Sequence, residues 1–137
     1  MLQPNRSIPD SSVIPELGYP DPLQASAWLC QAFGFQERLR IGDHRVQLVF
    51  GNGAIIVTGH WREGTQGNHA VMVRVADAQA HHAQAQRHGA RILNPPTDYP
   101  YGERQYSAQD LGGHVWTFTQ SLADIDPASW GGTLVTA

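Results

Sequence analysis

The chain has 137 residues, of which 41% are hydrophobic and 15% charged, a composition typical of one folded domain with a substantial core. All nine basic residues are arginines, spread from Arg6 to Arg104, and the formal net charge is −3, which argues against nucleic acid as a partner. The one cysteine, Cys30, can form no intramolecular disulfide. No apolar stretch reaches the roughly 20 residues of a membrane span. We therefore expect a cytoplasmic protein without membrane or nucleic-acid partners.

Local signals then divide the chain into an arm and two similar halves. Residues 1–12 are polar and hold two prolines, so we expect a flexible N-terminal arm. The first half, residues 13–59, opens with a short run of strand type. A helix is predicted over residues 23–33, because Asp21 and Pro22 are typical of a helix start and Gly34 of a helix end. Three strands are predicted next, at residues 36–41, 45–50 and 54–58.

The second half repeats this order after a linker at residues 60–68. It spans residues 69–120 and begins with a predicted strand at 70–75, in which β-branched residues alternate. Asp77 and Gly89 bracket a predicted helix over residues 78–88. Three further strands are predicted at residues 90–93, 104–109 and 114–119. Residues 121–137 form a C-terminal extension, which we expect to pack on the outside through Trp130.

Several motifs carry a resemblance to a known family. In the second half they are Ala70-Val-Met-Val-Arg-Val-Ala-Asp, Tyr101-Gly-Glu-Arg-Gln-Tyr and Asp110-Leu-Gly-Gly-His-Val-Trp-Thr-Phe. In the first half they are Pro15-Glu-Leu-Gly-Tyr-Pro-Asp and Ala32-Phe-Gly-Phe. The sequence resembles the glyoxalase/bleomycin-resistance/extradiol dioxygenase superfamily, the vicinal oxygen chelate proteins, and within it the branch named for a phosphonate-operon protein.

This resemblance implies an α+β fold. Two βαβββ modules would form a curved eight-stranded mixed sheet around a cavity, with the helices outside, and relatives often pair as homodimers. Strand parity then directs Glu16, Met72, Arg74 and Thr117 towards the cavity. Their apolar neighbours in the sequence are expected to pack against the helices; these neighbours are Leu17, Val71, Val73, Trp116 and Phe118.

The residues at the family's metal positions differ from its ligands. Metal-using relatives hold one divalent ion with His, Gln or Glu from the first and last strand of each module. Here the matching positions are Ile14, Ala70 and Thr117, and the fourth, within residues 54–58, finds no such residue. His69 falls one residue too early, which turns its side chain to the other face of a strand. We therefore expect no metal and no cofactor. The histidines of the second helix, His81, His82 and His88, are interpreted as a solvated helix surface rather than as a rival metal site.

Aromatic and charged residues near the expected cavity suggest the ligand. Trp61 in the linker and Tyr101 and Tyr106 around the seventh strand offer flat faces for stacking, and Arg104 offers a donor to a carboxylate or carbonyl. Packing is the alternative role for each aromatic residue, and a mutual ion pair the alternative for Glu16 and Arg74. The predicted ligand-binding residues are Glu16, Trp61, Met72, Arg74, Tyr101, Arg104, Tyr106 and Thr117.

These features favour a metal-free binding protein of the bleomycin-resistance type. It would sequester a planar, partly apolar organic compound and so give drug resistance or self-protection. The alternative is an enzyme, a lyase, isomerase or dioxygenase that uses a metal or an acid–base pair such as Glu16 with Tyr106. A third possibility is a partner subunit without chemistry of its own. No nucleophile lies beside a suitable base and acid, so no catalytic residue is assigned.

Overall fold

The first module contains one helix and four strands. The computed structural model describes residues 3–135. Within the first module the sheet order is β1-β4-β3-β2, with β1 parallel to β4 and the other pairs antiparallel. Its elements are β1 (Glu16–Gly18), α1 (Pro22–Phe33), β2 (Gln36–Ile41), β3 (Arg45–Phe50) and β4 (Gly53–Thr58).

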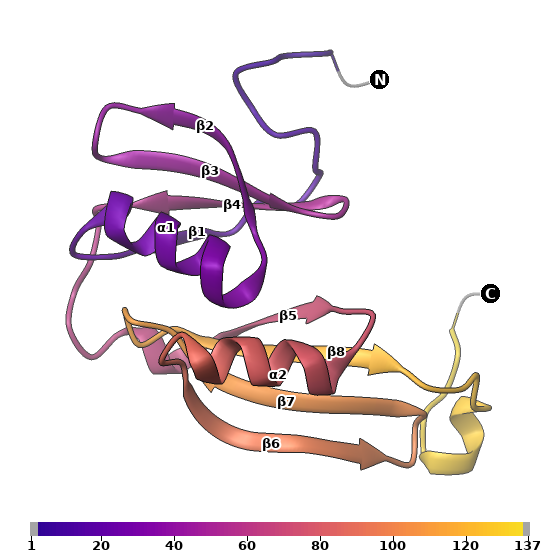
Figure 1. Ribbon diagram of the computed structural model, residues 1–137. Coiled ribbons are helices and arrows are strands. Elements are labelled where there is room, and N and C mark those ends of the chain that lie inside the picture. Colours follow the sequence, from indigo (N-terminus) through magenta and orange to yellow (C-terminus); the bar gives the residue numbers. More distant parts are fainter. Residues whose placement is uncertain (1–2, 136–137) are drawn as a thin grey trace.

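The second module repeats this topology. Its sheet order is β5-β8-β7-β6, with β5 parallel to β8 and the other pairs antiparallel. Its elements are β5 (Ala70–Arg74), α2 (Ala78–Arg87), β6 (Arg91–Tyr99), β7 (Glu103–Gln109) and β8 (Val115–Ser121), with short helices η1 (Gln66–Asn68) before them and η2 (Pro127–Trp130) after them. The predicted α+β fold of two βαβββ modules is confirmed. Its eight strands form two four-stranded sheets that are not closed into barrels (Figure 1).

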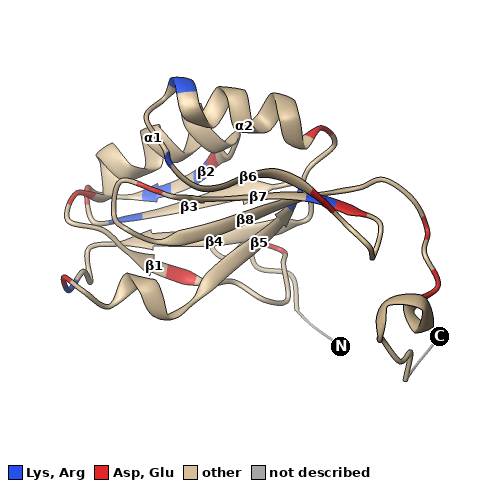
Figure 2. Ribbon diagram, turned by 90° about the horizontal axis from the view of Figure 1, so that it is seen from below, with Lys and Arg blue, Asp and Glu red and all other residues tan. Residues whose placement is uncertain are grey.

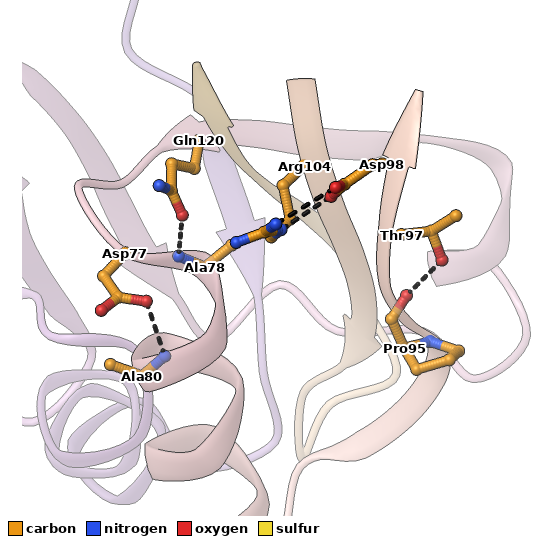
Figure 3. A network of polar contacts seen from close by, with 8 residues as sticks. All are labelled: Asp77, Ala78, Ala80, Pro95, Thr97, Asp98, Arg104 and Gln120. Carbon is orange, nitrogen blue, oxygen red and sulfur yellow. Dashed lines mark hydrogen bonds and ion pairs between the residues drawn. The ribbon is translucent and has the colours of Figure 1, made fainter. Parts of the chain in front are cut away.

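Both helices begin and end within one residue of the predicted bounds. The carboxylate of Asp21 accepts a hydrogen bond from the backbone N–H of Gln24 at 3.2 Å, and that of Asp77 accepts one from Ala80 at 3.0 Å. Each bond satisfies a free donor in the first turn of its helix, and Figure 3 shows the one at α2. Gly34 ends α1 with a φ of 88°, a conformation that costs glycine little. None of the helices in the described part of the chain is long and apolar enough to span a membrane.

The core lies between the two sheets and the two helices. Both helices cover the same side of the sheets (Figure 2). Leu17, Trp116 and Phe118 are at most 4% exposed and point towards the helices, while Val71 and Val73 pack on the same cluster. The predicted strand parity is therefore confirmed, because the alternate residues of these strands are the ones that face away from the helices.

Strand β6 runs further than the sequence predicts, to Tyr99 instead of residue 93. Pro95 and Pro96 read as strand breakers because proline has no N–H to donate. However, β6 is an edge strand, and its pairing with β7 shifts register between Asn94 and Thr97, the segment that holds both prolines. An irregular edge tolerates proline, so the strand continues past the pair.

Two buried polar clusters join the modules. In the first, the Asp110 carboxylate accepts hydrogen bonds from the Tyr19 hydroxyl at 2.5 Å, the Trp116 indole at 3.0 Å, and the backbone N–H groups of Gly112 and His114 at 2.9 Å each. Tyr19 belongs to the first module and Asp110 to the second. All of these groups are buried, and the Tyr19–Asp110 bond links the two modules.

The second cluster centres on His81 of α2. Its Nε2 lies 2.7 Å from the Phe33 carbonyl of the first module, and its Nδ1 lies 2.5 Å from the Tyr106 hydroxyl. A carbonyl only accepts, so Nε2 carries the proton and Nδ1 accepts from Tyr106. The prediction that His81 belongs to a solvated helix surface is wrong, because the side chain is half-buried between the modules.

Candidate ligand-binding face

Within residues 3–135, no helix or strand packs on one face of the second sheet, and we call it the open face. Its side chains belong to β5, β7 and β8 and point away from α2, as the strand register requires. Met72 is 62% exposed there and adjoins Val13, which is 79% exposed, so the apolar surface extends into the space between the modules. The open face consists of Ala70, Met72, Arg74, Glu103, Gln105, Ser107, Val115, Thr117 and Thr119.

Hydrogen bonds order the polar side chains of the open face. The Thr119 hydroxyl donates to the Glu103 carboxylate and accepts from the Gln105 amide at 3.1 Å. The Gln105 side-chain oxygen accepts from the Tyr101 hydroxyl at 3.2 Å, and the Ser107 and Thr117 hydroxyls lie 3.0 Å apart. These side chains are held in place by one another, so they present a fixed pattern of donors and acceptors.

Glu103 remains charged on this face. Burial acts to raise the pKa of its carboxyl group, but hydrogen bonds from Ser121 and Thr119 and the positive charge of Arg74 outweigh that effect, so the pKa lies below its ordinary value. The open face therefore carries an anionic group at Glu103 and a cationic group at Arg74.

A groove between the two modules meets the open face at Met72 and Arg74. We call it the inter-module groove; it encloses about 520 Å³. One wall is β5, and the other is formed by Val13 and Pro15 before β1 and by the turn between β3 and β4. Most of the lining is apolar, so the groove and the open face together offer adjoining apolar and polar surface to a ligand.

Aromatic rings border the open face where β6 turns into β7. The rings of Tyr99 and Tyr101 stack in parallel, with centroids 5.4 Å apart and an angle of 4° between planes. Trp130 of the C-terminal extension lies 5.3 Å from Tyr101, and its ring is part of this cluster. The sequence suggested Tyr101 because it lies close to the seventh strand. The position of Trp130 depends on the path of the C-terminal extension, which local sequence signals do not determine.

Glu16 and Trp61, two of the predicted site residues, lie away from the open face. Glu16 is on the matching face of the first sheet, where it forms an ion pair with Arg45. Trp61, in the linker, donates a 3.3 Å hydrogen bond from its indole to the Gly112 carbonyl. Gly112 lies just before the first residue of β8, whereas Tyr101 lies near the last residues of β8. Trp61 and Tyr101 are therefore at opposite ends of the second sheet.

Arg104 and Tyr106 occupy the helix-facing side of β7. Arg104 forms an ion pair with Asp98 at 2.7 Å and shares its side with Gln120, whose amide oxygen caps α2 at Ala78 (Figure 3). Tyr106 is fully buried, and burial raises the pKa of its hydroxyl well above the ordinary value. The structure therefore brings together Met72, Arg74, Tyr101 and Thr117, and separates them from Arg104 and Tyr106. It also separates the two members of the acid–base pair Glu16 and Tyr106.

Sequence and structure comparisons agree on the family. The profile of the Glyoxalase/Bleomycin resistance protein/Dioxygenase superfamily matches residues 15–118. The chain belongs to this superfamily. TioX from Micromonospora sp. ML1 is 35% identical, with a TM-score of 0.68, over 85% of this chain and 100% of TioX. No curated protein matches the sequence significantly.

More distant solved structures share the fold. TnmS3, an antibiotic-binding protein from Streptomyces sp. CB03234, is 20% identical with a TM-score of 0.66, over 79% of this chain and 93% of TnmS3. A family member from Burkholderia phytofirmans PsJN is 19% identical with a TM-score of 0.69, over 80% of this chain and 97% of its own. The fold of this chain thus also occurs in an antibiotic-binding protein.

The residues at the metal positions do not fit a divalent cation. Ala70 and Thr117 lie side by side with Val115 and Met72 on the open face, and β4 presents Ala54, Ile56 and Thr58 to the corresponding face of the first sheet. A hydroxyl and several aliphatic groups do not make the set of nitrogen and charged oxygen donors that such ions need. Among residues 3–135 there is no group of three or more His, Cys, Asp or Glu side chains suited to a metal.

Proposed function

We propose that this chain is a metal-free binding protein that sequesters a planar, partly apolar organic compound, and so protects a cell from a drug or from its own product. The observation that carries the proposal is the uncovered face of the second sheet, where an exposed thioether lies beside ordered hydrogen-bonding groups. The antibiotic-binding function of TnmS3, a protein of the same fold, supports the proposal at the level of fold.

The chemistry of the face argues for a flat ligand. The thioether of Met72 is polarisable and adapts to aromatic surfaces, and the Tyr101 ring offers an edge or face for stacking. Thr117 and Gln105 supply donors and acceptors that would orient polar substituents. A compound with fused rings and a few oxygen or nitrogen substituents matches both kinds of surface.

Calorimetric titration with naphthoquinone, anthraquinone, phenazine and quinoline derivatives tests the proposal. We expect saturable binding of at least one class, and we expect Tyr101→Ala to weaken it about fivefold through lost stacking. Trp61→Ala is the matched control, because it removes an aromatic ring at the opposite end of the sheet. Weaker binding in Trp61→Ala with unchanged binding in Tyr101→Ala would place the ligand at the linker and contradict the proposal.

Elemental mass spectrometry tests the metal-free part of the proposal. We expect no stoichiometric zinc, nickel, manganese or iron in the purified protein, and no thermal stabilisation by these ions. A bound stoichiometric metal would favour the enzyme alternative. The homodimer and the phosphonate-operon-like branch remain predictions from the resemblance, and the cytoplasmic location remains a prediction from the composition. Light scattering on the purified protein tests the homodimer.

A further inference from the structure

The inter-module groove carries one charged side chain in a mainly apolar lining. Its walls include Val13, Phe35, Phe50 and Met72, and among the described residues that line it Arg74 is the only charged one. The volume of about 520 Å³ is in the range of pockets that hold small organic molecules. A single positive charge at the edge of apolar surface is the complement of an amphipathic anion.

The guanidinium of Arg74 is available for a ligand. Within residues 3–135, the ion pairs of arginine with carboxylates closer than 4 Å involve Arg40, Arg45 and Arg104. Glu103 lies near enough for Arg74 to influence its pKa, but Thr119 and Ser121 already supply hydrogen bonds to that carboxylate. The donors of Arg74 therefore have no partner among the described side chains, and a guanidinium offers five of them in a planar fork.

We infer that the inter-module groove selects a planar organic anion, with its rings against Met72 and Val13 and its acidic group on Arg74. This inference rests on the proposed function and narrows the ligand class to aromatic carboxylates and similar acids. A carboxylate matches the guanidinium fork with two parallel hydrogen bonds, and the apolar walls strengthen them by excluding water. The neutral form of the same compound would keep the apolar contacts and lose this pair of bonds.

The methyl group of Met72 can report ligand binding in the groove. It has two methionines, Met1 and Met72, so 13C-methyl methionine labelling gives two signals, and Met72→Leu identifies the one from β5. We would titrate 2-naphthoate and its uncharged isostere 2-naphthamide, following the Met72 methyl shift and the dissociation constant by calorimetry. We expect both compounds to shift the Met72 signal, and 2-naphthoate to bind about tenfold more tightly because of the charged hydrogen bonds.

Three variants assign the preference to a residue. Arg74→Gln should abolish the tenfold preference by weakening 2-naphthoate far more than 2-naphthamide, and Arg74→Lys should keep part of the preference. Arg87→Gln, which removes the same charge at the end of α2, should keep all of it. Equal affinities in the wild type, or a preference that survives in Arg74→Gln, would overturn the inference but leave the proposed function intact. If neither naphthalene compound bound and the panel of planar compounds also failed, both would be overturned.

Discussion

The two modules share one topology, but the sheet face that points away from the helices is covered in the first module and open in the second. Gln47 pairs with Ile56 across β3 and β4 in the first module, as Ser107 pairs with Thr117 across β7 and β8 in the second. All four side chains point away from the helices. Gln47 is 2% and Ile56 5% exposed, whereas Ser107 and Thr117 are only half-buried.

The N-terminal arm accounts for this difference. The Gln47 amide donates to the Ser7 carbonyl at 2.8 Å and accepts from Arg38 at 2.6 Å, and Arg38 donates to the Arg6 carbonyl at 2.9 Å. Pro9 is buried against the module. A short segment outside the βαβββ unit thus converts one sheet face into a second small core. No segment of the described chain covers the open face of the second module in this way, which leaves it available for a ligand.

The largest expected effect comes from removing the Asp110 carboxylate, whose hydrogen bonds link the two modules. Asp110→Ala leaves the Trp116 indole, the Tyr19 hydroxyl and two backbone donors buried without an acceptor, so we expect the free energy of unfolding to fall by about 3 kcal/mol. Urea denaturation measures it. Asp98→Ala, which removes an exposed carboxylate from the same module, should leave the midpoint nearly unchanged.

The same denaturation experiment also tests whether Asp110 couples the unfolding of the two modules. If Asp110 couples them, the wild type unfolds in one transition and Asp110→Ala broadens or splits it when followed by far-ultraviolet circular dichroism and by tryptophan fluorescence. An Asp110→Ala variant as stable as the wild type would mean that the helix contacts alone join the modules, and that the buried carboxylate adds nothing to their union.

A matched pair of substitutions sharpens the contrast between covered and open faces. Gln47→Ala removes a buried amide that binds the arm and leaves Arg38 without that acceptor, so we expect a loss of about 1.5 kcal/mol. Ser107→Ala, at the equivalent position of the open face, should cost less than about 0.5 kcal/mol because water replaces the lost partner. Hydrogen exchange should show faster exchange at residues 5–9 in Gln47→Ala only. Equal losses in both variants would mean that the arm does not seal the first face.

Local signals predicted most of the fold. Asp21, Asp77 and Gly34 mark helix ends by chemistry that operates within one turn, and strand parity follows from the alternation of apolar side chains. The prediction ended β6 too early, because Pro95 and Pro96 would break a central strand. An edge strand such as β6 tolerates them. Edge position is a property of the whole sheet, which no local pattern contains.

The candidate site was predicted in part for a related reason. Parity placed Met72, Arg74 and Thr117 on one face, because each lies in a strand with a clear alternation. Tyr106 and Arg104 were selected for their chemistry instead, and they share the opposite face, two residues apart on β7. Tyr106 is buried among side chains of α2 and β8, including His81, His82 and Phe118, and these contacts between distant segments have no local signal.

The smallest expected effect concerns the His81 contact and its dependence on pH. Burial lowers the pKa of His81 below its ordinary value of 6.5, although the hydrogen bond to the Phe33 carbonyl opposes the shift. The unfolded chain therefore binds a proton at His81 more readily than the folded chain. Stability from this site is complete above about pH 6.5 and is lost as the pH falls below that value.

Urea denaturation at several values between about pH 7.5 and pH 5.5 measures this loss, because the carboxyl groups titrate mainly below that range. We expect the slope of stability against pH to flatten in His81→Gln, whose amide can replace both hydrogen bonds without titrating. His82→Gln is the control on the neighbouring residue and should keep the wild-type slope. A wild-type slope in His81→Gln would mean that protonation elsewhere governs the acid response, and that the joint between the modules tolerates a charged imidazole.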